Sequence, residues 1–275
     1  MPTVIPYIPQ RITVHLGTPN SDAENVTVSF PDYVKNVASS EIYPTWDEDA
    51  LRANIYAIVS FALNRVYTEW YRSRGYNYDI TNSTAYDQYF VNGRSYFTNI
   101  SRLVDELFND YLRRPGFVEP LAAKFCNGTT AICEGLSQWG SENLAQQGYT
   151  YDQILRSYYG NVEIVNNAPV QGITTSYPGT PLRRGTTGPS VVTAQVMLNR
   201  ISQNYPAIPK ISPVDGIFGA RTEAAVRKFQ EVFNLQLVGI IGTATWYALV
   251  RYYIAVTRMA ELRSQGQKYY QNSWA

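Results

Sequence analysis

The feature that most constrains the fold of this chain is a stretch rich in Pro, Gly and Thr at residues 161–189. It contains turn-forming runs such as Asn166-Asn-Ala-Pro and Tyr177-Pro-Gly-Thr-Pro, which interrupt helices and strands alike. Because one hydrophobic core stops growing at roughly 250–300 residues, a break at this place in a chain of 275 residues is typical of a domain boundary. We therefore expect a domain over residues 1–165, a linker over 166–189 and a helical domain with a C-terminal extension over 190–275.

The two parts differ in charge, although the whole chain has a net charge of only +1. Residues 1–170 carry 12 Lys and Arg against 18 Asp and Glu, a net charge of −6, whereas residues 171–275 carry 11 against 4, a net charge of +7. A basic domain suits an anionic polymer as its partner, but chance surface composition explains the asymmetry equally well.

Composition excludes several classes of protein. A hydrophobic share of 45% is too high for a disordered chain, and no run of 18 apolar residues predicts a membrane span. A single histidine, His15, and two cysteines leave little material for a zinc site or a Ser/His/Asp triad, so we predict no metal and no cofactor. The 23 Tyr, 5 Trp and 10 Phe suit sugar-stacking surfaces, although large cores also use aromatic residues.

Periodicity predicts an α+β fold. Alternation favours two strands near the N-terminus, at residues 11–16 and 26–30. Spacings of three and four favour amphipathic helices at 31–40, 48–71, 100–112 and 137–147, followed by a short helix through Ile154 and Tyr158 that Gly160 ends. After the linker, they favour helices at 190–203, 222–233 and 243–260. The helix at 48–71 is the longest, and we expect one face of it to be buried.

The C-terminal part contains two similar segments, Asp215-Gly-Ile-Phe-Gly-Ala-Arg-Thr222 and Val238-Gly-Ile-Ile-Gly-Thr-Ala-Thr-Trp246. Each has a glycine turn that leads into a helix, the first of which we expect Thr222 to cap. This repeated combination of a glycine turn and a following helix resembles the three-helix peptidoglycan-binding domain of bacterial wall hydrolases. The resemblance implies peptidoglycan as a partner and makes Asp215, Phe218 and Trp246 candidates for wall contact; for the two aromatic residues we favour core packing.

The N-terminal part resembles the SpoIID (stage II sporulation protein D) and amidase-enhancer family in three segments that occur in order over about residues 30–160. They are Phe30–Trp46, Thr81–Tyr89 and Glu134–Tyr149. Combined with the binding domain, they resemble spore cortex-lytic enzymes, which are lytic transglycosylases. The resemblance implies a place of action in the spore cortex, the coat or the cell wall, and no nucleic-acid partner. No cleavable signal is visible at the N-terminus, and removal of a pro-segment by an activating protease is one of several explanations for that.

The resemblance places the family's catalytic glutamate at Glu41. In this sequence Glu41 ends a short helix and precedes Ile42, Tyr43 and Trp46, whose apolar surfaces would remove solvent and favour the protonated carboxyl. One such group suffices for a lytic transglycosylase: it protonates the glycosidic oxygen and then deprotonates the muramic 6-hydroxyl, which closes on C1 to give a 1,6-anhydro product. The alternative is a helix-end glutamate that only bonds the following turn.

Further candidates surround this position in the family segments. Gln88 is a candidate for bonding a sugar, with an amide that stabilises its own loop as the equal alternative. Ser137 and Gln138 are candidates for orienting either the substrate or Glu41. Trp139 suits stacking on a sugar, although burial at the start of a helix is the interpretation we favour. Tyr86 is a further candidate substrate contact.

Tyr86 and Asp87 occupy positions where one branch of the family has zinc ligands. Because that branch uses His and Cys there, the resemblance implies no zinc in this loop. The spacing of Cys126 and Cys133 fits a disulfide-closed loop in a protein that works outside the reducing cytoplasm, and two buried thiols are the alternative.

Two functions therefore remain open from the sequence. The first is a lytic transglycosylase that cleaves the MurNAc–GlcNAc backbone of cortex peptidoglycan during germination. The second is a non-catalytic wall-binding protein that activates an N-acetylmuramoyl-L-alanine amidase. The presence of Glu41 favours the enzyme.

Overall fold

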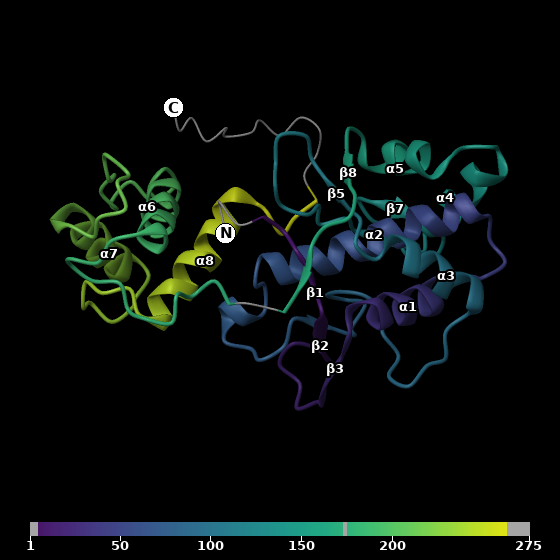
Figure 1. Ribbon diagram of the computed structural model, residues 1–275, viewed down its shortest axis with the longest axis horizontal. Helices are drawn as coiled ribbons and strands as arrows, with labels where there is room; N and C mark the ends of the chain where they lie inside the picture. The colour runs from purple at the N-terminus through teal and green to yellow at the C-terminus, as the bar shows by residue number, and fades with distance from the viewer. Residues whose placement is uncertain (1–4, 173–174, 263–275) are drawn as a thin grey trace.

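The computed structural model describes residues 5–172 and 175–262, and within them the fold is α+β as expected (Figure 1). Two hydrophobic cores account for most buried side chains, one built from residues between Ile8 and Ala168 and the other from residues between Leu182 and Ala260. The boundaries at 165/166 and 189/190 stay a prediction, and the part of the C-terminal extension after residue 262 lies outside the described residues. None of the described helices is both long and apolar enough to span a membrane.

The expected helices and the two expected strands occur in the predicted order, and short strands that were not predicted lie before and between them. The helices of the first core are α1 (Phe30–Glu41), α2 (Glu48–Tyr67), η1 (Arg72–Arg74), α3 (Thr98–Leu107), α4 (Gln138–Gln146) and α5 (Tyr151–Tyr159). The strands are β1 (Ile8–Pro9), β2 (Arg11–His15), β3 (Asn25–Ser29), β4 (Ile80–Thr81), β5 (Tyr111–Arg113), β6 (Phe125–Cys126), β7 (Leu136–Ser137), β8 (Glu163–Val165) and β9 (Val170–Gln171). The helices of the second core are α6 (Pro189–Ser202), α7 (Ala220–Val232) and α8 (Thr243–Thr257).

Helix α2 is the centre of the first core, with α1, α3, α4, α5 and β5 packed around it. It begins at the N-cap Asp47, whose carboxylate accepts the N–H of Asp49 at 2.9 Å. The prediction of a single buried face was wrong, because almost the whole helix surface is covered by other elements. The helix also ends at Tyr67, four residues before the expected end, since the buried Glu69 has a left-handed φ of 46° that turns the chain.

The sheets are short, and one of them corrects a predicted helix. Strands β2 and β3 form an antiparallel pair that β4 extends in parallel, while β5 pairs with β8, β6 with β7 and β1 with β9. Residues 108–112 were expected to continue helix α3, but Tyr111 and Leu112 lie in β5, opposite Val165 and Ile164. A short apolar run fits a buried strand as well as a helix, so periodicity alone misplaced it.

The second core uses the same hydrogen-bonding device twice. The side-chain amide of Gln195 accepts the N–H of Gly216 and donates to the Ile217 carbonyl and the Thr222 hydroxyl. In the second copy, Gln230 accepts the N–H of Gly239 and donates to the Ile240 carbonyl and the Thr245 hydroxyl. Both glycines have a φ of 71°, a left-handed conformation that glycine adopts without strain.

The expected role of Thr222 as a helix cap was wrong. The N-caps of α7 and α8 are Gly219 and Gly242, and neither helix has a side-chain cap hydrogen bond. Thr222 lies instead inside the first turn of α7, where its buried hydroxyl holds the Gln195 amide at 3.1 Å.

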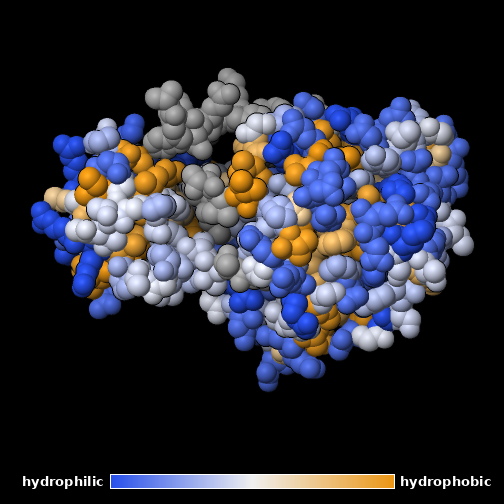
Figure 2. Space-filling model, in the orientation of Figure 1, coloured by the Kyte–Doolittle hydropathy of each residue, from blue (hydrophilic) through white to orange (hydrophobic). Residues whose placement is uncertain are grey.

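The two cores are joined at the C-terminal end of α2. The Glu69 carboxylate accepts the N–H and the hydroxyl of Ser176, and the same hydroxyl accepts the indole N–H of Trp246 at 2.9 Å. Asn64 of α2 also donates to the carbonyl of Met259, just after α8, at 2.9 Å. On the face shown in Figure 2, hydrophilic residues cover most of the larger part of the molecule, and hydrophobic residues occur between them in scattered groups.

Candidate active site

Glu41 is the last residue of α1, and its half-buried carboxylate is held from two sides. Oε1 accepts the backbone N–H of Tyr89 at 2.9 Å, and Oε2 accepts the side-chain amide N–H of Gln138 at 3.1 Å. Each carboxylate oxygen can accept a further hydrogen bond, so the group stays able to meet a ligand. The structure thus brings together two of the residues predicted from the sequence, Glu41 and Gln138.

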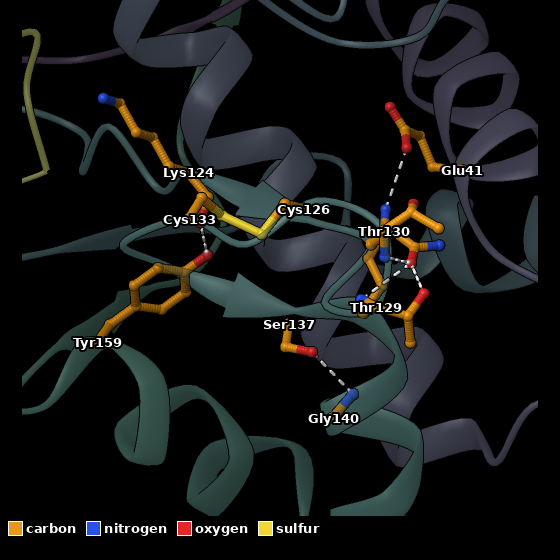
Figure 3. Close-up of a disulfide and its surroundings, with 11 residues drawn as sticks. Glu41, Lys124, Cys126, Thr129, Thr130, Cys133, Ser137, Gly140 and Tyr159 are labelled. Atoms are coloured by element: carbon orange, nitrogen blue, oxygen red, sulfur yellow. Dashed lines mark hydrogen bonds between the residues drawn. A yellow bond between two sulfur atoms is a disulfide. The ribbon is translucent and has the colours of Figure 1, made fainter.

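Gln138 reaches Glu41 because several contacts fix the start of α4. Ser137 is the N-cap, and its hydroxyl accepts the N–H of Gly140 at 3.0 Å (Figure 3). A Cβ at Gly140 would overlap the hydroxyl of Tyr158, so a larger residue there would displace the Tyr158 side chain. Ser141 then receives the amide of Asn54 at 2.8 Å, which ties α4 to α2. Ser137 therefore positions Gln138 through the backbone, without a hydrogen bond to Glu41 itself.

Gln88 has a different role from the sugar contact considered for it. Its side chain is only 1% exposed, accepts the Tyr33 hydroxyl at 2.9 Å and donates to the Ile58 carbonyl at 3.1 Å. Burial, with the nearby negative charges of Asp87 and Glu41, raises the pKa of Tyr33, so its hydroxyl keeps the proton that it donates to Gln88. Gln88 is thus the loop-stabilising amide that was its alternative interpretation, and it lies one residue before Tyr89.

Asp87 anchors the same loop through four donors. Its buried carboxylate accepts Arg65 Nε at 2.8 Å, the Tyr71 hydroxyl at 2.5 Å, and the N–H and hydroxyl of Thr81 at 3.0 and 2.7 Å. No local pattern in the sequence predicts this network, because its members come from α2, β4 and the segments that follow them. The side-chain contacts of Asp87 and Gln88 therefore hold the backbone directly before Tyr89, whose N–H bonds Glu41.

The loop contains no arrangement of metal ligands. Tyr86 is exposed, whereas the carboxylate of Asp87 is fully engaged by its donors. Within residues 5–172 and 175–262, no group of three or more His, Cys, Asp or Glu side chains could hold a metal ion. His15 is buried, bonds Asn25 at 2.8 Å and stacks on Tyr78, as a structural residue does.

Three aromatic side chains that follow Glu41 and its partner Gln138 in the chain contact one another. Tyr43 and Trp46 follow Glu41 in the chain, and both contact Trp139, with ring centroids 5.6 and 5.0 Å apart. Trp139 is 36% exposed and Tyr43 is 57% exposed, whereas Trp46 is 9% exposed beneath them. The burial that we favoured for Trp139 was therefore wrong, since the side chain stays open at the surface.

Cys126 and Cys133 form a disulfide that closes a short loop (Figure 3). Cys126 belongs to β6, which pairs in parallel with β7 directly before Gln138. Inside the loop, the carbonyl of Asn127 accepts the N–H of Trp139 at 3.2 Å. The loop thus supports the backbone that carries both Gln138 and Trp139.

Acidic neighbours of Glu41 are occupied by structural contacts. Asp47 caps α2, Glu142 accepts the N–H of Asp47 at 2.9 Å, and Glu48 forms ion pairs with Arg52 and Arg102. The hydrogen bonds from those two arginines lower the pKa of Glu48, which keeps it ionised. The arrangement therefore suits chemistry in which one carboxyl group both gives and takes a proton.

The candidates in the second core divide in the same way into buried and open residues. Phe218 and Trp246 are buried in the core, as we favoured, and cannot touch a wall polymer in this structure. Asp215 is exposed, and hydrogen bonds from Gln195 and from the N–H of Ile217 lower its pKa. The sequence analysis did not single out the exposed apolar residues beside the two glycine turns, which are Ile217, Leu237 and Val238.

Comparison with known proteins agrees with both resemblances. Residues 21–107 match the family model of the stage II sporulation protein SpoIID, and residues 187–249 match that of a peptidoglycan binding domain. Each match covers less than half of the chain. A solved structure described as the SleB N-terminal domain is 31% identical over 28% of this chain and 97% of that chain, with a TM-score of 0.24. Among curated proteins no match is found.

The two family matches give the chain a role at the cell wall in sporulation, with peptidoglycan as a partner. Glu41 lies inside the SpoIID region, whereas Gln138 and Trp139 lie after it. The contact between Glu41 and Gln138 therefore joins the matched region to a part of the chain that the family model does not cover.

Proposed function

We propose that the chain is a peptidoglycan lytic transglycosylase in which Glu41 acts first as the general acid and then as the general base. The observation that carries the proposal is the carboxylate of Glu41, held between the Tyr89 N–H and the Gln138 amide within an open, aromatic-lined region. The SpoIID match and the peptidoglycan-binding domain support the MurNAc–GlcNAc backbone as substrate, and we place the reaction in spore cortex during germination. Because a SpoIID match is combined with a match to a peptidoglycan-binding domain, we also propose that the activity is similar to that of the spore cortex-lytic enzyme SleC.

The proposed reaction balances without water. Protonated Glu41 gives its proton to the glycosidic oxygen, and the bond between C1 of the muramic sugar and that oxygen breaks. The 6-hydroxyl of the same sugar then bonds to C1, and its proton passes to the Glu41 carboxylate, which returns to the starting state. A hydrolase with two carboxylates would instead activate water, but the neighbouring acids Asp47 and Glu142 are held in structural contacts.

Gln138 suits both protonation states of Glu41. Its side-chain amide has a donor and an acceptor, so the N–H pairs with the carboxylate and the carbonyl oxygen pairs with the carboxylic acid. We expect this residue to orient the carboxyl throughout the reaction.

The test is a comparison of Glu41→Gln with Glu134→Gln on purified cortex peptidoglycan. Glu134 is an exposed acid of the same family segment as Gln138, so it is a matched control for the loss of one carboxylate. General acid–base catalysis contributes typically 10²–10⁴-fold, so Glu41→Gln is expected to lower activity by at least about 10²-fold while Glu134→Gln stays near the parent rate.

Mass spectrometry of the products identifies the reaction. The parent protein is expected to give 1,6-anhydromuramic ends, and reducing ends would show hydrolysis instead. If Glu41→Gln digests cortex at the parent rate, Glu41 is not catalytic. In that case, stimulation of an added N-acetylmuramoyl-L-alanine amidase would favour the activator function.

A further inference from the structure

The aromatic residues beside Glu41 form a built surface that the proton-transfer chemistry does not use. The rings of Tyr43 and Trp139 are open to solvent, and Trp46 packs against both from below, with centroids 5.7 Å from Tyr43 and 5.0 Å from Trp139. Exposing two large aromatic rings side by side leaves apolar area in water, so such a surface marks a place where a ligand binds.

This surface is fixed in place on three sides. Trp46 directly precedes the N-cap of α2, Trp139 lies in the first turn of α4, and the backbone of Trp139 is bonded to the carbonyl of Asn127 in the disulfide-closed loop. Contacts between aromatic rings then limit the rotation of each side chain. A ligand that stacks here therefore meets rings whose positions are already set, and little ordering entropy is lost on binding.

Its position relative to the carboxylate indicates what the ligand is. Gln138, whose amide holds Oε2 of Glu41, is the chain neighbour of Trp139, and Tyr43 is two residues after Glu41. On the other side, the N–H that holds Oε1 belongs to Tyr89, whose side chain is 45% exposed. The rings of Tyr43 and Trp139 thus follow closely on the two residues that form the hydrogen bond between Glu41 and Gln138, and offer a contact surface to the unit next to a linkage that reaches Glu41.

We propose that Tyr43 and Trp139 form a subsite that stacks on the C–H face of one N-acetylhexosamine ring, next to the linkage that Glu41 attacks. The inference rests on the proposed function for the identity of the polymer. A pyranose ring has a flat apolar face and a polar rim, so it covers an aromatic surface while its hydroxyl and acetamido groups stay in water.

The test measures binding by the full chain with the Glu41→Gln substitution, so that the probe is not cleaved. The probe is the soluble hexamer of β-1,4-linked N-acetylglucosamine, and the readout is the set of indole N–H signals in nitrogen–proton NMR spectra. The signals of Trp139 and Trp46 are expected to shift on titration. The signal of Trp246, which is buried and bonded to Ser176, is an internal control and should not move.

Substitutions then measure the share of each ring. Trp139→Ala is expected to weaken binding about three- to tenfold, the range for loss of one aromatic contact, and Trp139→Phe to restore part of it. Tyr149→Ala removes a similarly exposed aromatic residue that lies beyond the other end of α4, so it should leave the affinity unchanged.

The outcomes separate this inference from the proposed function. If the Trp139 signal stays fixed, or if Trp139→Ala binds the hexamer as tightly as its parent, the subsite is overturned whatever Glu41 does. If the signal shifts but Glu41→Gln still digests cortex, the stacking subsite stands and the catalytic role of Glu41 fails. Binding of a protein to this surface in place of the sugar would likewise appear as no shift with the hexamer.

Discussion

Replacing Asp87 by Asn is expected to cost both stability and activity, because this carboxylate holds the loop that reaches Glu41. Its partner Arg65 is only 7% exposed, and its Nη1 already has no hydrogen-bond partner. Removing one member of a buried ion pair costs about 3–5 kcal/mol, because the other charge stays buried without compensation. Asn keeps the size of Asp and can still accept from Tyr71 and Thr81, so we expect the lower end, about 3 kcal/mol.

Asp79→Asn is the matched control. Asp79 is also buried and accepts Arg72 Nε at 2.5 Å and the N–H of Thr13 at 2.8 Å, but no hydrogen bond connects it to the loop that precedes Tyr89. The side chain of Arg72 is 27% exposed against 8% for Arg65, so water can compensate part of its charge. We expect a loss of about 2 kcal/mol, the range of a hydrogen bond to a charged group.

The two variants should differ far more in activity than in stability. Asp87 lies two residues before the N–H that orients Glu41, and a misplacement of about 1 Å at a reacting group can cost 10²-fold in rate. At a temperature where both variants are folded, Asp87→Asn is expected to lose about 10- to 10²-fold in turnover with unchanged wall binding. Asp79→Asn should keep the parent turnover.

Urea unfolding gives the stability of each variant, and turnover is measured on solubilised cortex glycan. Hydrogen exchange of the Tyr89 amide supplies a reading that does not depend on activity, since this N–H should exchange faster in Asp87→Asn and not in Asp79→Asn. Equal losses of activity in the two variants, or an unchanged exchange rate at Tyr89, would refute the positioning role of Asp87.

Two further predictions follow from the same structure. Replacing Cys126 and Cys133 by Ser is expected to lower the free energy of unfolding by about 2.5 kcal/mol, the chain-entropy value for so short a loop. Turnover should also fall, because the loop supports the start of α4, and reduction of the parent protein should give the same two changes. A double variant with parent activity would contradict this prediction. Burial raises the pKa of the Glu69 carboxyl, so the folded chain binds the carboxyl proton more tightly than the unfolded chain does. The stability that Glu69 contributes is therefore fully present below its ordinary pKa of 4.5 and is lost as the pH rises through the raised pKa. Glu69→Gln should therefore be more stable than the parent at pH 7, with the difference shrinking towards pH 4 in urea titrations, and a constant difference across that range would show that Glu69 is not the titrating group.

The sequence could predict the elements whose signals are local. Glycine turns, capping residues and apolar spacing lie within a few residues of one another, which is why the helices of the second core were found within a few residues of their observed ends. Prediction from local patterns failed where contacts with residues distant in the sequence decide the secondary structure or the burial. Tyr111 and Leu112 became a strand because β8 is there to pair with them, and α2 lost its exposed face because four helices surround it.

The candidate site shows the same limit more sharply. Glu41 came from the family resemblance, but its contact with Gln138 spans 97 positions of the chain and depends on how α1 and α4 pack against α2. The sequence pointed to Gln88, but the group that bonds Glu41 is the backbone N–H of the next residue, Tyr89. Since every residue except proline has such an N–H, the residue type does not indicate which one bonds Glu41. Backbone donors in loops are positioned by tertiary contacts, and only a structure shows them.

Helix α2 gives these separate observations a common physical cause. At its N-terminal end, the N–H of Asp47 is held by Glu142 of α4, the helix whose first residue bonds Glu41. At its C-terminal end, Arg65 pairs with Asp87, the anchor of the loop that bonds the other oxygen of Glu41. A helix of 20 residues is about 30 Å long, so this one buried helix positions both hydrogen-bond partners of the Glu41 carboxylate. Just after the helix, Glu69 bonds Ser176, which in turn bonds Trp246 of the second core. A change that shifts α2 along its axis would therefore move both hydrogen bonds of Glu41 together, whereas a change confined to one loop would move only one.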